Sequence, residues 1–247
     1  MAAARSGGIT AIRTATNLQM STITESQTAH LRLLQLISPS LPVGAFTYSQ
    51  GLEWAVECGW VTGEAELSDW VRSLMESSLT HLEMPLLARL FRACAANDSQ
   101  ALTYWSRYLV AARETFELRE EERNRGRALL RLLPEIGIPV SEQIRPLLNS
   151  CQLAGFAYAA YHWKIPLRSA AEGYLWGWLE NMVLAGVKIV PLGQTAGQRI
   201  IATLTAFIPG MVEKGLALGD ASIGAACPAQ ALASSLHETQ YTRIYRS

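Results

Sequence analysis

The stretch SPSLPVGAFTYSQGLEWAVE, residues 38–57, separates two segments whose apolar residues recur with helical periodicity. Pro39 and Pro42 favour a rigid corner here, because proline fixes its own φ and restricts the residue before it. The helix expected over residues 29–37 should therefore stop near Ser38. The stretch predicts a helical chain that turns sharply at this point, and it raises the question whether the corner also serves as an interaction surface.

A second helix is expected directly after the corner. Thr47 is followed three positions later by Gln50, which is the spacing of a capping box at a helix N-terminus. The helix should run through Leu52 and end near Gly59, since glycine commonly follows the last helical turn.

Helical periodicity continues along the chain, and no segment shows the alternation of a β-strand. We expect a single all-α domain of roughly eight to ten helices over residues 28–247. Its further helices are predicted at about residues 64–81, 85–96, 98–133 (as one helix or two), 142–163, 167–190 and 194–217, with a short last one from residue 228. Glycines inside these helices predict close packing of backbones, within the chain or between chains.

Residues 1–27 are expected to form a disordered extension. Residues 1–19 contain Arg5 and Arg13 and no acidic residue, a composition superficially similar to that of a transit peptide. We favour a simpler interpretation, in which Met20 is the translation start and the residues before it are an upstream addition.

The chain has 247 residues, of which 49% are hydrophobic and 17% charged, and its formal net charge is zero. This composition is typical of a globular protein. A protein that binds nucleic acid through phosphate contacts would be clearly basic, so we expect no nucleic-acid partner. No stretch has the length and apolar character of a membrane span. The four cysteines lie far apart without a CxxC pair, which favours reduced thiols in the cytoplasm.

The sequence lacks the common motifs for catalysis and for metal or nucleotide binding. Two GxxxxG spacings, at residues 210–215 and 219–224, lack the lysine that a phosphate-binding loop requires. There is no HExxH and no GxSxG, and the four histidines are scattered. We therefore expect no catalytic residue, no resident metal and no cofactor.

Two charged features each allow two interpretations. The segment RETFELREEERNRGRALLRLL, residues 113–133, is either a solvated helix face, which we favour, or a docking surface for a charged partner. Lys188 ends an almost uncharged helix. It either stabilises the helix C-terminus through the dipole or contacts a partner protein.

The C-terminal segment HETQYTRIYRS, residues 237–247, is rich in tyrosine and arginine, which are enriched at binding hot spots. If the segment continues as a helix, His237, Tyr241 and Ile244 share one face, and Arg243 lies between two tyrosines. We favour a segment that orders on a partner over one packed on its own core.

Together these stretches resemble the UreF family of urease accessory proteins. The corner is followed in the family's order by RETFELREEERNRG (residues 113–126), AGVKIVPLGQTAGQ (185–198) and HETQYTRIYRS (237–247). The resemblance covers essentially residues 30–247, and the motifs are specific in combination. The N-terminal extension is the one departure.

The resemblance implies an all-α homodimer without catalytic residues of its own. Members of the family bind the accessory protein UreD, called UreH in some systems, and this pair recruits the GTPase UreG to the urease apoprotein. There an active-site lysine is carbamylated and two nickel ions are inserted. A regulatory effect on the GTPase is also implied.

By the same analogy we place partner-binding surfaces on the corner, on the turn after Lys188 and on a C-terminal region of about residues 228–247. Phe46 and Tyr48 are expected to be exposed, and the C-terminal region should lie near the corner, jointly covered by UreD. The candidate partner-binding residues are Phe46, Tyr48, Ser49, Gln50, Glu53, Lys188, Gln194, His237, Glu238, Tyr241, Arg243 and Tyr245.

Two alternatives come from other functional classes. An all-α enzyme with a helical cofactor pocket requires a cluster of ligands, which the scattered histidines do not provide. A purely architectural dimer would not associate with a GTPase.

Overall fold

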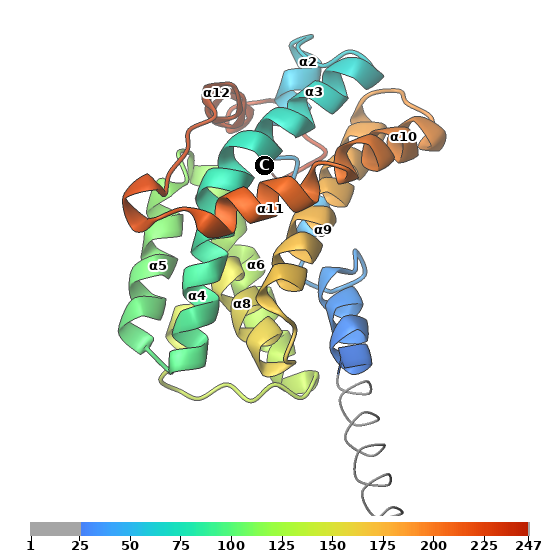
Figure 1. Ribbon diagram of the computed structural model, residues 1–247. Coiled ribbons are helices and arrows are strands. Elements are labelled where there is room, and N and C mark those ends of the chain that lie inside the picture. Colours follow the sequence, from blue (N-terminus) through green and yellow to red (C-terminus); the bar gives the residue numbers. More distant parts are fainter. Residues whose placement is uncertain (1–25, 247) are drawn as a thin grey trace, which may run out of the picture.

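The computed structural model describes residues 26–246 as helices joined by mostly short loops (Figure 1). The predicted all-α class is confirmed, since no strand occurs in that range. Disorder before residue 26 and a start at Met20 concern residues outside the described range, whereas residues 26 and 27 already belong to the first helix, residues 26–37. The later elements are η1 (Ala45–Thr47), α2 (Leu52–Glu57), α3 (Glu64–Leu74), η2 (Met75–Glu83), α4 (Met84–Ala96), α5 (Ser99–Ala112), α6 (Phe116–Glu135), α7 (Arg145–Asn149), α8 (Gln152–His162), α9 (Leu167–Ile189), α10 (Gln194–Thr205), α11 (Ile208–Ala217), η3 (Asp220–Ser222) and α12 (Pro228–His237).

The corner turns as predicted, but the capping box is wrong. The Thr47 hydroxyl donates to the carbonyl of Gly44 at 2.8 Å and does not cap a helix. Helix α2 instead begins after Gly51, whose φ of 86° lies in the left-handed region. Gln50 is also left-handed, with φ 54°, and its side chain is engaged elsewhere in the protein. The local spacing thus suggested a cap that tertiary contacts prevent.

Two helices predicted over residues 64–81 and 85–96 are one continuous helical rod, formed by α3, η2 and α4. Pro85 does not break this rod, although it has no N–H for the carbonyl of His81 four residues earlier. Element η2 is a π-helix, and its wider turn leaves that carbonyl available. The backbone N–H of Gly224 donates to the His81 carbonyl at 3.0 Å, so the linker after α11 replaces the missing bond.

Three other boundaries differ from the periodicity or refine it. Asp98 caps α5 and Thr115 caps α6, each by accepting backbone N–H bonds, so residues 98–133 hold two helices. The patterns expected over residues 142–163 and 194–217 are each divided, into α7 with α8 and α10 with α11.

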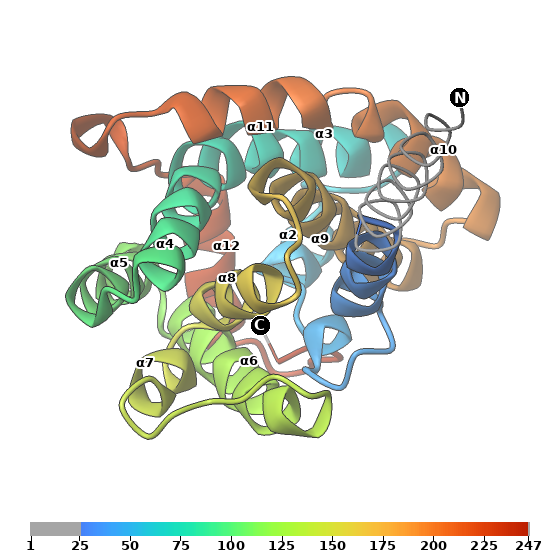
Figure 2. The ribbon, with the colours of Figure 1, turned by 60° about the horizontal axis from the view of Figure 1, so that its bottom comes forward.

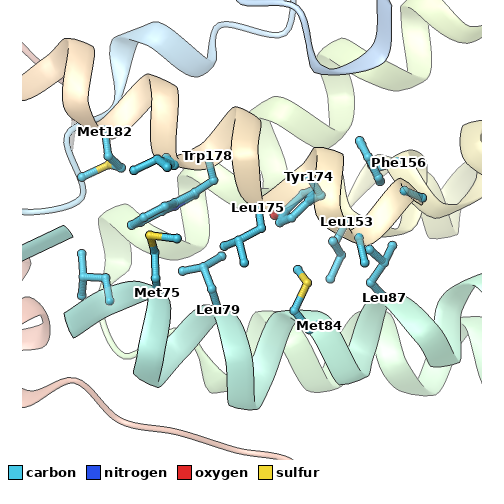
Figure 3. Close-up of a cluster of buried hydrophobic side chains, with 14 of the residues drawn as sticks. Met75, Leu79, Met84, Leu87, Leu153, Phe156, Tyr174, Leu175, Trp178 and Met182 are labelled. Atoms are coloured by element: carbon cyan, nitrogen blue, oxygen red, sulfur yellow. The ribbon is translucent and has the colours of Figure 1, made fainter. Parts of the chain in front are cut away.

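Helix α9 runs through the centre of the protein and supplies much of the core. Figure 3 shows Tyr174, Leu175 and Trp178 of α9 facing side chains of the α3–η2–α4 rod and of α8. The glycines of α9 permit close approach: a Cβ on Gly173 would lie 2.7 Å from a methyl carbon of Leu33, and one on Gly186 would lie 2.5 Å from Leu67. The predicted close packing therefore occurs within the chain.

The C-terminal end of the chain returns to the corner. Helix α12 packs on α2 and α6, and the residues after it cross the protein beside α2 (Figures 1 and 2). Because residues 228–237 form α12, the term C-terminal tail is used below for residues 238–246. No single helix of the described residues meets the length and hydropathy of a membrane span, although α10 and α11, bent by 45°, do so jointly.

Candidate partner-binding site

The C-terminal tail lies across the corner and helix α2 through backbone hydrogen bonds. The N–H of Arg246 donates to the carbonyl of Thr47 at 2.8 Å. The N–H groups of Ile244 and Tyr245 donate to the two carboxylate oxygens of Glu53, at 2.7 and 2.9 Å. Tail and corner therefore form one surface, and the expectation that they lie close together is confirmed.

His237, the last residue of α12, lies beneath this surface and is completely buried. Its Nδ1 lies 2.8 Å from Oε2 of Glu117 in α6, and its Nε2 lies 3.2 Å from Oε2 of Glu53 in α2. Burial by itself would lower the pKa of His237, but the hydrogen bonds to both carboxylates raise it above the ordinary value. The ring thus joins three helices.

The tail and α12 are fixed to the start of α6 by further contacts. A guanidinium nitrogen of Arg243 lies 3.0 Å from Oε1 of Glu117. Oε1 of Glu238 accepts the backbone N–H groups of Phe116 and Glu117, at 2.9 and 3.4 Å. A carboxylate at a helix N-terminus is favourable, because unpaired N–H groups and the positive end of the dipole lie there.

Behind the corner, Gln50 joins three parts of the protein. Its amide nitrogen donates to both carboxylate oxygens of Glu121 at 3.0 Å, and its amide oxygen accepts the indole N–H of Trp178 at 3.1 Å. Glu121 is also paired with Arg125 at 2.7 Å. Burial raises the pKa of Glu121 in spite of that arginine.

The charged face of α6 continues into the core, where Arg113 lies between two buried carboxylates. Its guanidinium is 2.9 Å from Glu83 and 3.2 Å from Glu122. The hydroxyl of Tyr174 donates to Glu83 at 2.6 Å. Burial opposes ionisation of Glu122, but Arg113 and the Leu153 N–H hold the pKa of that carboxyl below its usual value. Both interpretations of this face, as solvated or as a docking surface, are wrong for these buried residues.

A cleft under the corner is lined by apolar side chains and by Tyr48, Gln50, Glu121, Arg125 and Trp178. Its two charged groups are already paired with each other. Within residues 26–246, no three His, Cys, Asp or Glu side chains are arranged to hold a metal ion. At His237 the two glutamates lie at opposite nitrogens of the ring, so they do not converge on a common point.

Comparison with known proteins identifies the family. The family model described as UreF matches residues 61–205. The chain is 53% identical over 222 residues to the urease accessory protein UreF of Pseudomonas putida strain W619, with 90% of this chain and 99% of that protein covered. It is 49% identical to the UreF of Alcanivorax borkumensis and 47% identical to that of Enterobacter sp. strain 638, each covered over its full length by 90% of this chain. The chain belongs to the UreF family. Its role is therefore that of an accessory protein in urease maturation, and it is not an enzyme.

In this UreF-family chain, the candidate residues divide into exposed and buried ones. Phe46, Lys188, Gln194, Tyr241 and Arg243 are exposed, and Glu238 is half-buried. The other six are buried, so their side chains are not free to contact a partner in this conformation: Tyr48, Ser49, Gln50, Glu53, His237 and Tyr245. The expected exposure of Tyr48 is wrong, because its side chain is buried and lines the cleft under the corner. The buried polar members instead hold the surface in place.

The shared helical face expected for His237, Tyr241 and Ile244 is also wrong, because α12 ends at His237 and the tail is not helical. Tyr241 is fully exposed, and Ile244 is 71% exposed while its backbone is bound to Glu53. Lys188 and Gln194 belong to the α9–α10 turn, which lies away from α12 in both views (Figures 1 and 2). The structure therefore separates two candidate surfaces.

Exposed apolar residues surround the tail that were not predicted from the sequence. Leu232 and Leu236 of α12 and Phe116 at the start of α6 are exposed. The spacing of the two leucines, four residues apart, was a usable signal of one helix face. Phe116 had no such signal, because its position beside the tail depends on the contact between Glu238 and α6.

Proposed function

We propose that the chain acts in urease maturation as a non-catalytic, homodimeric scaffold. It binds UreD with the surface formed by tail and corner, and the pair recruits the GTPase UreG to the urease apoprotein. Nickel is the cargo of this assembly and not a resident metal of the chain. The work takes place in the cytoplasm, without nucleic acid or membrane.

One observation carries the placement of the UreD surface. Phe46, Tyr241 and Ile244 expose large apolar side chains, and the tail that carries two of them is held on the corner by backbone hydrogen bonds from Ile244 to Glu53 and from Arg246 to Thr47. Exposed apolar and aromatic groups on an ordered surface are typical of protein interfaces. Preorganisation of the tail also reduces the entropy lost on binding.

Capture of UreD tests this surface. Replacement of Tyr241 by alanine should weaken capture about tenfold or more, because truncation of a tyrosine hot spot at an interface costs about 2 kcal/mol or more. Arg243→Ala should also weaken it, and both variants should keep the melting temperature of the wild type. Tyr104→Ala on α5 is the matched control, since Tyr104 is also an exposed tyrosine and lies outside the tail. Unchanged capture by Tyr241→Ala would remove the tail from the interface.

We assign the α9–α10 turn to the GTPase. Lys188 is exposed in the last turn of α9, and Gln194 begins α10. Lys188→Ala should alter GTP hydrolysis by UreG in the assembled complex without changing the melting temperature of the chain. If hydrolysis and urease activation stay normal and only stability falls, by about 0.3–1 kcal/mol, Lys188 serves the helix dipole alone.

A further inference from the structure

We propose that protonated His237, which donates one ring N–H to Glu117 and the other to Glu53, holds the C-terminal tail on the corner, and that deprotonation of the ring frees the tail and dismantles the partner-binding surface. The effect on the partner rests on the proposed function. The release of the tail is a property of the isolated chain.

The position of the ring requires the proton. Both ring nitrogens lie within hydrogen-bond distance of a carboxylate oxygen, Nδ1 at 2.8 Å from Glu117 and Nε2 at 3.2 Å from Glu53. A neutral imidazole carries only one N–H, whereas imidazolium carries two. A neutral His237 would therefore direct a lone pair at one of the two carboxylates.

The surrounding charges balance only when the ring is protonated. Glu53 and Glu117 are buried, and the cations beside them are His237 and Arg243, whose side chain is 40% exposed. Deprotonation leaves two carboxylates and one cation in this site. Buried charge without a partner is costly, so the arrangement must open.

The groups that face this site come from three helices and the tail. Glu53 belongs to α2, which also supplies Glu57, bound by Gln240 of the tail. Glu117 belongs to α6. From α12 and the tail come His237, Glu238, which is turned toward the backbone of α6, Arg243 and Tyr245.

The same carboxylate that meets His237 also holds the tail. Glu53 accepts the backbone N–H groups of Ile244 and Tyr245, so any displacement of Glu53 moves the tail. The guanidinium of Arg243 donates to Glu117, the other carboxylate that faces His237. Loss of the contacts of His237 with Glu53 and Glu117 therefore loosens the tail at two points.

The direction of the pH effect follows from the raised pKa of His237, which results from hydrogen bonds to Glu117 and Glu53 that overcome burial. A folded-state pKa above the unfolded one gives stability that is complete below the unfolded value and is lost as the pH rises through the folded value. The tail should thus be docked at mildly acidic and neutral pH and released at alkaline pH.

Hydrogen exchange of the full chain tests the release without any partner. Protection of the Ile244 and Tyr245 amides, after correction for the intrinsic exchange rate, should fall at least about tenfold between about pH 6 and about pH 9. In His237→Gln the protection should be low and independent of pH. The matched control His30→Gln, at an exposed position of the first helix, should behave as the wild type.

Constant protection of the wild type over this range, or full protection in His237→Gln, would overturn the proposal. If His237→Gln does not fold, NMR titration of labelled histidines in the wild type replaces it. The His237 ring and the Ile244 and Tyr245 amides should then titrate with one common midpoint above the ordinary histidine value. Separate midpoints would contradict the control of the tail by protonation of His237.

Capture of UreD at the two pH values separates this inference from the proposed function. Weaker capture at the alkaline pH, together with tail release, supports both. Tail release with unchanged capture would support the control of the tail by His237 but would reject the tail as the UreD surface. Capture that depends on Tyr241 while protection stays constant would reject the proton-held tail alone.

Discussion

Gly51 illustrates how strongly one residue constrains the corner. Its φ of 86° favours glycine, and a Cβ at this position would lie 2.7 Å from the backbone nitrogen of Ser234 in α12. The contact joins the entry of α2 to the helix that carries the tail. Any side chain here must therefore both strain the backbone and displace α12.

Gly51→Ala should lower the free energy of unfolding by about 3 kcal/mol, the sum of left-handed strain and overpacking. Gly59→Ala isolates the strain, because Gly59 has φ 80° and a Cβ added there would meet no atom within 4 Å. We expect that control to cost only about 1 kcal/mol. Urea denaturation of both variants provides the measurement, and equal losses would show that the approach of α12 contributes nothing.

At single positions the sequence shows which side chains have the chemistry for an interaction, but it does not show whether they are exposed or buried. Tyr48 and His237 are candidate interaction residues because of their chemistry, yet both are buried. His237 is buried because two glutamates, 184 and 120 positions away in the chain, supply its hydrogen bonds. No local pattern contains such pairs. Tyr241, by contrast, is fully exposed, with no element of residues 26–246 packed over it.

Among the elements, α6 shows where periodicity is insufficient. Its charges are expected to face solvent, since charged residues are rarely buried without partners. Three glutamates of α6 are buried nevertheless, and each has a cation beside it: Glu117, Glu121 and Glu122. Helix existence and its capping by Thr115 follow from local rules, but the identity of the buried face follows from the partners on other helices.

Arg113 provides the test of this buried face. Arg113→Met should cost about 3–5 kcal/mol, because it leaves Glu83 and Glu122 buried without the guanidinium that is paired with both. Arg168→Met is the control, since Arg168 forms an exposed pair with Glu172 at 2.9 Å that contributes about 0.3–0.5 kcal/mol. Urea denaturation at neutral pH compares the two. A loss below about 1 kcal/mol in Arg113→Met would mean that the two carboxyls take up protons at little cost.

For the whole molecule, the exposed apolar residues fall into separate groups. One group surrounds the tail and is assigned above to UreD. Another lies on the outer face of the first helix, where Leu31 is 64% and Leu34 is 49% exposed, while Leu33 on the opposite side packs against Gly173. The proposed homodimer needs a self-complementary surface, and we propose that this exposed apolar face of the first helix supplies it.

Replacement of both Leu31 and Leu34 by aspartate should therefore convert the dimer to a monomer. Two carboxylates placed in an apolar contact around a twofold axis would be desolvated and would repel their symmetry mates. The fold should persist, because neither side chain belongs to the core. Sedimentation velocity gives the mass, and circular dichroism checks helicity. Leu232→Asp with Leu236→Asp, on the exposed face of α12, should stay dimeric and instead lose UreD. If the dimer survives the first pair of changes and dissociates with the second, then α12 forms the dimer contact and the first helix does not.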